Sequence, residues 1–377
     1  MNEFLSSFKL ICRVLCISLS TSQMVALRDE LKNGLVCWQT VSEMANHYLV
    51  APAFWAGVVA KDLLPWLPES PARYFKEIFQ LNRTRNSQLR RQMLEAVSAM
   101  QNVGIQTILL KGAAQLAQPI HTDIGCRIMT DLDILIEEDR YALAYDTLRK
   151  LGYQPLKLSY DPNKHHHYCP VYRTGDFGRI ELHRHAVHLK NLPLLPTPDV
   201  WNNSQAVTVD GITVRLPSPT HAVLINILHS QVGDRYHHLR QINLRALLDF
   251  AALQRYYADT IQWAPIRQVF IEHHLKSVLD GYLLGAHRLL NAPVRVGYTP
   301  GFLGRIQYLV CLAAVRWFLV DAVMQRADAL SAEMICKLFK CPSTPFPITA
   351  YRCAYIFRYL RNRFFMSPPA DAAQSEK

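Results

Sequence analysis

Apolar residues recur every three or four positions through most of the first hundred residues, which is the spacing of amphipathic helices. The clearest run is carried by Leu27, Leu31, Leu35, Trp38 and Val41. The prolines of the segment LPWLPESP interrupt this pattern, which then resumes in one long stretch. The spacing therefore predicts a helical region over residues 1–100 that ends in a long helix over residues 72–100.

The N-terminal segment is where a targeting signal would lie. Its apolar positions are interrupted by Lys9 and Arg13. The apolar run from Val14 to Leu19 is shorter than the roughly 7–15 residues of a signal-peptide core. No stretch reaches the roughly 18 apolar residues that cross a bilayer. We therefore expect an amphipathic first helix, no membrane span and a cytoplasmic protein.

From residue 101 the pattern changes to short apolar runs and to alternation, as in β-strands. Strands are predicted over residues 105–110, 128–136, 153–158, 168–172 and 179–183. Helices are predicted over residues 113–118 and 139–151. Gly152 follows the second helix and suits the left-handed conformation at a helix end. The pair Asp210-Gly211, flanked by two alternating runs, predicts a β-hairpin.

After Ser218-Pro219, a pair typical of a helix start, the spacing is helical again. Helices are predicted over residues 221–230, 239–257, 264–291, 303–324 and, with a basic character, 349–365. The tail after Met366 is rich in Ser, Pro and Ala and is expected to be disordered.

This order of elements predicts an α+β fold with a small mixed or antiparallel sheet. The sheet would occupy a core over residues 101–217. An N-terminal helical region, residues 1–100, would precede it. A C-terminal helical domain, residues 218–365, and the tail, residues 366–377, would follow.

Net charge and cysteine content restrict the possible functional classes of the protein only a little. The 377 residues carry a formal net charge of +11, which favours anionic partners such as nucleotides, nucleic acid or a membrane surface without choosing among them. The nine cysteines are scattered and form no CxxC pair. They are interpreted as small buried residues of a reducing compartment rather than a zinc site or a disulfide framework.

Three acidic residues carry the candidate chemistry. Asp131 and Asp133 lie two positions apart in a predicted strand, so their side chains point to the same face, with alpha carbons roughly 6.5–7 Å apart. Glu181 lies in the alternating strand RIELH, on a face that we expect to be exposed together with His183. Pairing of the two strands would gather three carboxylates, which suit magnesium or manganese bound jointly with substrate phosphates.

The segment before the acids supplies positive charge. Lys111-Gly112 ends one strand and opens a helix, where glycine allows the backbone to approach a phosphate and the helix N-terminus attracts it. Lys111 can reach a phosphate oxygen, and Arg127 is a second candidate. Glu181 or Asp133 would also help to deprotonate an acceptor hydroxyl.

The elements LLKGAA, RIMTDLDILI, LGY and IELH resemble an uncharacterised bacterial nucleotidyltransferase family of the DNA polymerase beta type superfamily. The resemblance implies that Asp131, Asp133 and Glu181 are metal ligands. It also implies that Lys111, Gly112 and Arg127 lie near the triphosphate of an NTP, ATP among the candidates. The usual Gly-Ser pair is Gly112-Ala113 here, so a serine hydroxyl is missing, and the spacing from Gly112 to the acids is longer than in many relatives.

The predicted function is therefore metal-dependent transfer of a nucleoside monophosphate from an NTP to an acceptor, with release of pyrophosphate. The acceptor is left open among a peptide or protein hydroxyl, RNA, a sugar and a small molecule. The alternative is a catalytically inactive basic protein that binds a nucleotide or RNA. The basic helix over residues 349–365 is interpreted as a solvated face, with binding of RNA or an anionic acceptor as its alternative.

The histidines allow a further alternative. Glu181, His183 and His185 have the spacing of a zinc or manganese site in a metallohydrolase, although no HExxH or HxHxD motif is present. His183 is expected either to contact the substrate or to support the metal ligands from behind without binding the metal itself. His165–His167 are interpreted as loop residues at the mouth of the site. By the resemblance, His229 and Asp249 pack near the site, with helix packing or capping as the alternative.

Overall fold

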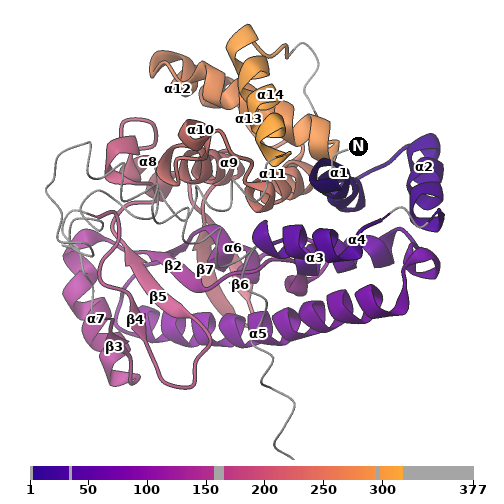
Figure 1. Ribbon diagram of the computed structural model, residues 1–377. Helices are drawn as coiled ribbons and strands as arrows, with labels where there is room; N and C mark the ends of the chain where they lie inside the picture. Colours follow the sequence, from indigo (N-terminus) through magenta and orange to yellow (C-terminus); the bar gives the residue numbers. More distant parts are fainter. Residues whose placement is uncertain (1–2, 34–35, 157–164, 294–297, 317–377) are drawn as a thin grey trace, which may run out of the picture. The chain divides into compact units, whose positions relative to one another are not determined.

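The computed structural model describes residues 3–33, 36–156, 165–293 and 298–316. Its elements up to Leu312 belong to one compact unit, and Figure 1 shows them labelled along the chain. The predicted helix over residues 349–365, the tail, and the end of the predicted helix over 303–324 lie outside the described residues.

Helices precede the sheet, as the apolar spacing predicts. They are α1 (Glu3–Leu15), α2 (Thr21–Lys32), α3 (Trp38–His47), α4 (Ala51–Ala60) and α5 (Glu69–Asn102). The first is amphipathic as expected, because Phe8 and Ile11 are fully buried while Lys9 is exposed. Within the ranges given above, none of the helices combines the length and the hydrophobicity that a bilayer crossing requires.

The sheet has seven strands in the order β3-β4-β5-β2-β1-β7-β6. They are β1 (Ile108–Leu109), β2 (Asp131–Leu135), β3 (Gln154–Pro155), β4 (Val171–Tyr172), β5 (Arg179–His183), β6 (Gln205–Val209) and β7 (Ile212–Leu216). The pairs β2·β5 and β1·β7 are parallel and the other pairs are antiparallel. The α+β fold with a mixed sheet is therefore confirmed, as is the hairpin at Asp210-Gly211.

Several strands are shorter than their apolar runs. The apolar run over residues 105–110 contributes only the two residues of β1. In the run over residues 128–136, strand β2 begins only at Asp131, because its partner strand β5 begins at Arg179. The expected helix over 139–151 is observed as α7 (Tyr141–Lys150), preceded by a short turn of 3₁₀ helix. Gly152 has the positive φ expected after that helix, +90°.

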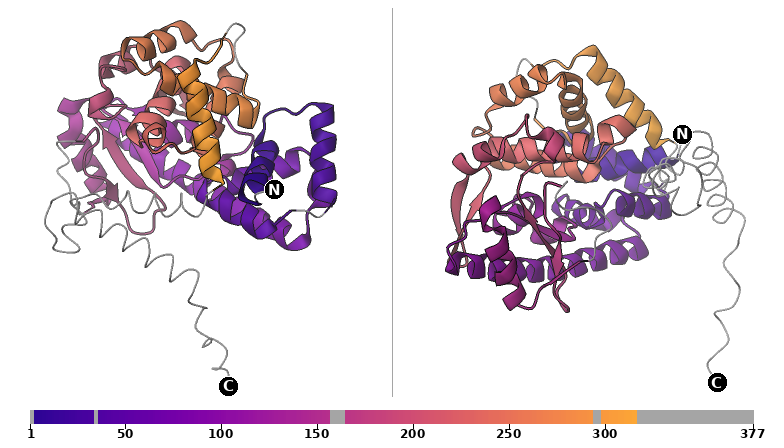
Figure 2. Two further views of the ribbon diagram at one scale, coloured as in Figure 1. Left: turned by 45° about the horizontal axis from the view of Figure 1, so that its top comes forward. Right: turned by 90° about the vertical axis from the view of Figure 1, so that its left-hand side faces the viewer.

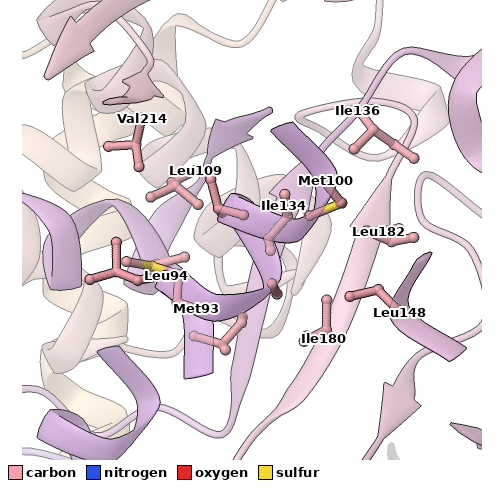
Figure 3. Packing of buried hydrophobic residues seen from close by; sticks show 14 of the residues in the cluster. Met93, Leu94, Met100, Leu109, Ile134, Ile136, Leu148, Ile180, Leu182 and Val214 are labelled. Carbon is pink, nitrogen blue, oxygen red and sulfur yellow. The ribbon is translucent and has the colours of Figure 1, made fainter. Parts of the chain in front are cut away.

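One face of the sheet packs on α5, which runs along it in Figure 1. Met93 and Met100 of this helix and Leu148 of α7 meet Ile134 and Ile180 of the central strands in one buried cluster, which Figure 3 shows from close by. Burial of this apolar surface is the main stabilising contribution to the arrangement.

The long helix also positions the two central strands through polar side chains. The amide of Asn86 donates to the backbone oxygens of Ile124 and Arg127 at 2.6 and 2.8 Å, just before β2. The amide of Gln92 donates to the oxygen of Gly178, just before β5, at 2.9 Å. Buried backbone carbonyls need such partners, and α5 thereby holds the starts of β2 and β5 side by side.

Helices cover the other face of the sheet, and the views in Figure 2 show them opposite α5. They are α9 (Pro219–Ile227), α10 (Tyr236–Leu239) and α11 (Leu244–Tyr257). Helices α12 (Trp263–Glu272) and α13 (Lys276–Leu290) pack on these, and α14 (Phe302–Val315) follows. The short helix α6 (Lys111–Ala117) contacts both β2 and α5. The predicted helix start is confirmed, because the hydroxyl of Ser218 accepts from the His221 amide. The predicted helix over 264–291 is two helices, since His274 adopts a left-handed φ of 57° between them.

Candidate active site

Two acidic side chains meet where β2 and β5 pair. These strands are parallel, and their register puts Asp133 directly opposite Glu181. Because side chains alternate along a strand, both carboxylates point to the face away from α5. The face toward α5 is apolar and buried, through Leu132, Ile134, Ile180 and Leu182. The expected pairing of the two strands and their expected alternation are confirmed.

The donor atoms that lie closest together include a histidine. One donor atom from each of Asp133, Glu181 and His183 lies within 4.8 Å of the others. Asp131, the first residue of β2, is outside this group and lines the adjoining cavity. Burial, followed by the charges of Asp133 and Glu181, raises the pKa of Asp131. The carboxylates therefore repel one another, and a bound cation would relieve that repulsion.

His183 is fully buried, so the expectation that it shares an exposed face with Glu181 was wrong. The reason is that His167 pairs with it in a β-bridge and covers it. His183 Nε2 lies 2.8 Å from Asp133 Oδ1 without hydrogen-bond geometry. Its Nδ1 lies 3.3 Å from the His185 carbonyl oxygen, the partner that commonly orients an imidazole whose Nε2 binds a metal. These side chains therefore fit a divalent cation.

Lys111 is paired with the central acid. Its Nζ donates to Asp133 Oδ1 at 2.8 Å, and its side chain is only 16% exposed. Burial alone would raise the pKa of Asp133, but Lys111 and His183 outweigh it and hold that pKa well below its usual range. Asp133 is therefore ionised and ready to bind a cation, provided that Lys111 moves aside.

Gly112 is required by a neighbouring side chain. A Cβ at this position would lie 2.5 Å from Arg127 Nη1 and 3.3 Å from Met129 Sδ. Arg127 cannot easily move away, because its Nε donates to Asp249 Oδ2 at 2.9 Å. The absence of a side chain at Gly112 thus makes room for the guanidinium group.

We expect Gly112→Ala to lower the free energy of unfolding by about 1–3 kcal/mol, the usual effect of overpacking a filled site. Denaturant unfolding measures this change. Gly285→Ala is the matched control, because a Cβ there would meet Leu247 and Tyr308 at ordinary distances of 3.7 and 3.9 Å. Equal stability of Gly112→Ala and the unmodified chain would contradict this reading of the glycine.

Arg127 belongs to a buried charge network that joins the sheet to α11. Asp249 accepts from Arg127 Nε at 2.9 Å, and its other oxygen lies 2.8 Å from His121 Nε2. Asp249 is 4% exposed. Burial by itself would raise the pKa of Asp249, but the Arg127 charge and the His121 contact lower it strongly. Asp249 therefore carries a full charge and holds the guanidinium beside the site.

A second, partly buried guanidinium, that of Arg245, was not predicted from the sequence. Arg245 lies one helical turn before Asp249 on α11 and donates through Nη1 to the Ile128 oxygen at 3.2 Å. Burial, followed by the Arg127 charge, lowers the pKa of Arg245. Over the described ranges it makes no ion pair with a carboxylate. The spacing of Arg245 and Asp249 on one helix face was the signal available in the sequence.

These groups surround a cavity of about 160 Å³ between the sheet and the helices that follow it. The sheet side contributes Lys111, Asp131 and Asp133, and the helix side contributes His229 and Arg245. His229 and Asp249 both line this cavity, in agreement with the expectation that they pack near the site. The cavity thus combines carboxylates suited to a cation with guanidinium groups suited to an anion.

The sequence motifs and this geometry agree with the comparison with known protein families. The sequence model of a protein family described as an uncharacterised nucleotidyltransferase matches residues 35–291. This range includes the sheet with its acidic strands and helices α9 to α11. A search of curated proteins gave no significant match. The chain therefore belongs to this family of uncharacterised nucleotidyltransferases.

Proposed function

We propose that this chain transfers a nucleoside monophosphate from an NTP to a hydroxyl acceptor and releases pyrophosphate. The observation that carries the proposal is the parallel register of β2 and β5, which puts Glu181 opposite Asp133. Asp133 lines a cavity that is also lined by the guanidinium groups of Arg127 and Arg245. Carboxylates hold the divalent cation in such reactions, and cations compensate the phosphate charge.

Asp131, Asp133 and Glu181 would hold Mg²⁺ or Mn²⁺, with His183 as a further donor. The bound ion would neutralise the phosphate oxygens and polarise the reacting phosphorus. The imidazole of His183 favours Mn²⁺ more than a site made of oxygen atoms alone would. Glu181, which is partly exposed, is the better placed carboxylate to accept a proton from the acceptor hydroxyl.

Lys111 would exchange partners during binding. In the structure its ammonium group is bound to Asp133, the carboxylate that we assign to the cation. Once Asp133 coordinates a cation, Lys111 Nζ loses this partner and can donate to a phosphate oxygen in the same cavity. Arg127 is already held by Asp249, so its role is to contribute fixed positive charge beside Gly112.

The test is incubation of the purified chain with each NTP labelled at the α-phosphate, with Mg²⁺ or Mn²⁺ and a cell extract as the source of acceptor. Mass spectrometry identifies any product that has gained a nucleotide. We expect transfer that requires the metal and a matching release of pyrophosphate. Absence of transfer from all four NTPs with either metal would overturn the proposal.

The Lys111–Asp133 pair also favours a second candidate, a basic protein that binds a nucleotide or RNA without catalysis. Its central acid, Asp133, is already paired with the ammonium group of Lys111. Calorimetry with each NTP separates the two candidates. Binding that needs a divalent cation supports the enzyme, and metal-independent binding that weakens steeply with salt supports the binding protein.

Arg245 provides a prediction about the triphosphate. Arg245→Met should raise KM for the NTP by about tenfold to a hundredfold, because a hydrogen bond between charged groups contributes about 1.5–3 kcal/mol. Steady-state kinetics measures the change. Arg255→Met is the control on the same helix, because Arg255 donates to the Ile120 oxygen at 3.2 Å and does not line the cavity. An unchanged KM would remove Arg245 from the phosphate site.

A further inference from the structure

A second group of metal-binding side chains lies beside the carboxylates. One ring nitrogen from each of His165, His166 and His167 lies within 4.8 Å of the others. The ring of His188 packs on this group, with its centroid 5.4 Å from that of His166 and 6.4 Å from that of His165. His183 lies on the other side of the group, 5.1 Å from the His166 ring, and separates it from Asp133.

The backbone at the end of β5 and just after it holds the segment that carries these histidines. The amides of Arg184 and His185 donate to the His166 oxygen at 3.0 and 3.1 Å, and the Tyr168 amide donates to the Leu182 oxygen at 2.8 Å. The backbone that carries the imidazoles is therefore attached to the end of the sheet. Such preorganisation reduces the entropy lost on binding an ion.

The hydrogen bonds of the rings favour ligation. Nδ1 of His167 lies 2.8 Å from the Tyr168 carbonyl oxygen, so it carries the proton and the lone pair is on Nε2. The buried Nδ1 atoms of His166 and His188 have no hydrogen-bond partner anywhere in the part of the chain that the structure describes. Buried polar atoms without partners are costly, and a bound cation would satisfy them.

The charge state of the rings agrees with this geometry. Burial, together with the neighbouring imidazoles, lowers the pKa of His166, and burial lowers those of His167 and His188. Neutral imidazole is the form that binds metals. A solvated loop would instead leave its histidines exposed, whereas His165–His167 are only partly exposed.

We propose that His165, His166 and His167, with His188 as a fourth donor, bind a divalent transition-metal cation of the zinc class. Nitrogen donors of this kind select Zn²⁺ over Mg²⁺, which prefers oxygen. The site is distinct from the carboxylate site and does not depend on nucleotidyl transfer. Its bound ion would fasten the segment before β4 to the segment after β5, next to the carboxylates.

Zinc binding to the full-length chain tests the proposal. The protein is stripped with a chelator and dialysed, and ZnCl₂ is titrated in a calorimeter with excess MgCl₂ present to occupy the carboxylates. We expect one zinc ion per chain. The double substitution His165→Gln with His167→Gln should abolish this binding, whereas the control His273→Gln, at the end of α12 and outside the cluster, should retain it.

A carboxylate variant distinguishes the two sites. Glu181→Gln should keep its zinc, and loss of zinc in this variant but not in the double histidine variant would overturn the proposal. If the double histidine variant does not fold, X-ray absorption of the zinc-loaded unmodified protein decides the question. Three or more imidazole ligands support the histidine site, and coordination mainly by oxygen overturns it.

Discussion

Asp131→Asn should reduce nucleotidyl transfer about 10³-fold or more while leaving the stability of the fold unchanged or higher. The loss of activity follows because a carboxylate that holds the cation contributes several kcal/mol to the transition state. The stability follows because burial, together with repulsion by Asp133 and Glu181, raises the pKa of Asp131, and a neutral amide avoids both the cost of burying a charge and the repulsion. Asp131 forms no ion pair among the described residues, so the substitution leaves no lysine, arginine or histidine side chain without a partner.

Initial rates with labelled NTP and thermal unfolding of the same preparation measure both effects. Asp139→Asn is the matched control, since Asp139 is 75% exposed and lies outside the site. A drop in activity together with equal or greater stability is the signature of a functional residue. Transfer that remains within about tenfold of the unmodified rate would show that Asp131 does not hold the cation.

Asp249→Asn should lower the free energy of unfolding by about 3–5 kcal/mol, because it leaves the guanidinium of Arg127, whose side chain is only 12% exposed, without its carboxylate. Denaturant unfolding measures the loss. Combining it with Arg127→Met should restore much of the stability, since that removes the unpaired charge. The exposed pair of Arg90 and Asp210 is the comparison, and Asp210→Asn should change stability far less.

If Asp249→Asn were as stable as the unmodified chain, the network would not join the sheet to α11. The double variant also informs the proposed mechanism. It should fold yet bind NTP poorly, because the positive charge beside Gly112 is gone. Wild-type affinity for NTP in that variant would mean that Arg127 acts only in folding.

Local signals in the chain were sufficient for most elements of the fold. The alternation of Asp131, Leu132 and Asp133 predicted one polar and one buried face, and the structure has both. Asp210-Gly211 predicted the hairpin, and Ser218 predicted a helix start. These features depend on neighbours in the sequence, so the pattern determines them.

Strand lengths and helix breaks were predicted less well. The run over residues 105–110 became a two-residue strand, because strand length is decided by the partner that completes the hydrogen-bond ladder. The predicted helix over 264–291 broke at His274, whose left-handed conformation the sequence did not signal. Both errors concern interactions that apolar periodicity does not encode.

The sequence by itself determined the family motifs, the faces of the acidic strands and the presence of a basic chain with candidate phosphate contacts. Only the tertiary structure decided which groups meet. Asp249 lies 122 residues from Arg127 in the chain, and His183 is buried because His167 pairs with it. The parallel register that sets Asp133 against Glu181 is a pairing between distant strands. Such contacts depend on how packed elements align in space, and local patterns carry no information about that alignment.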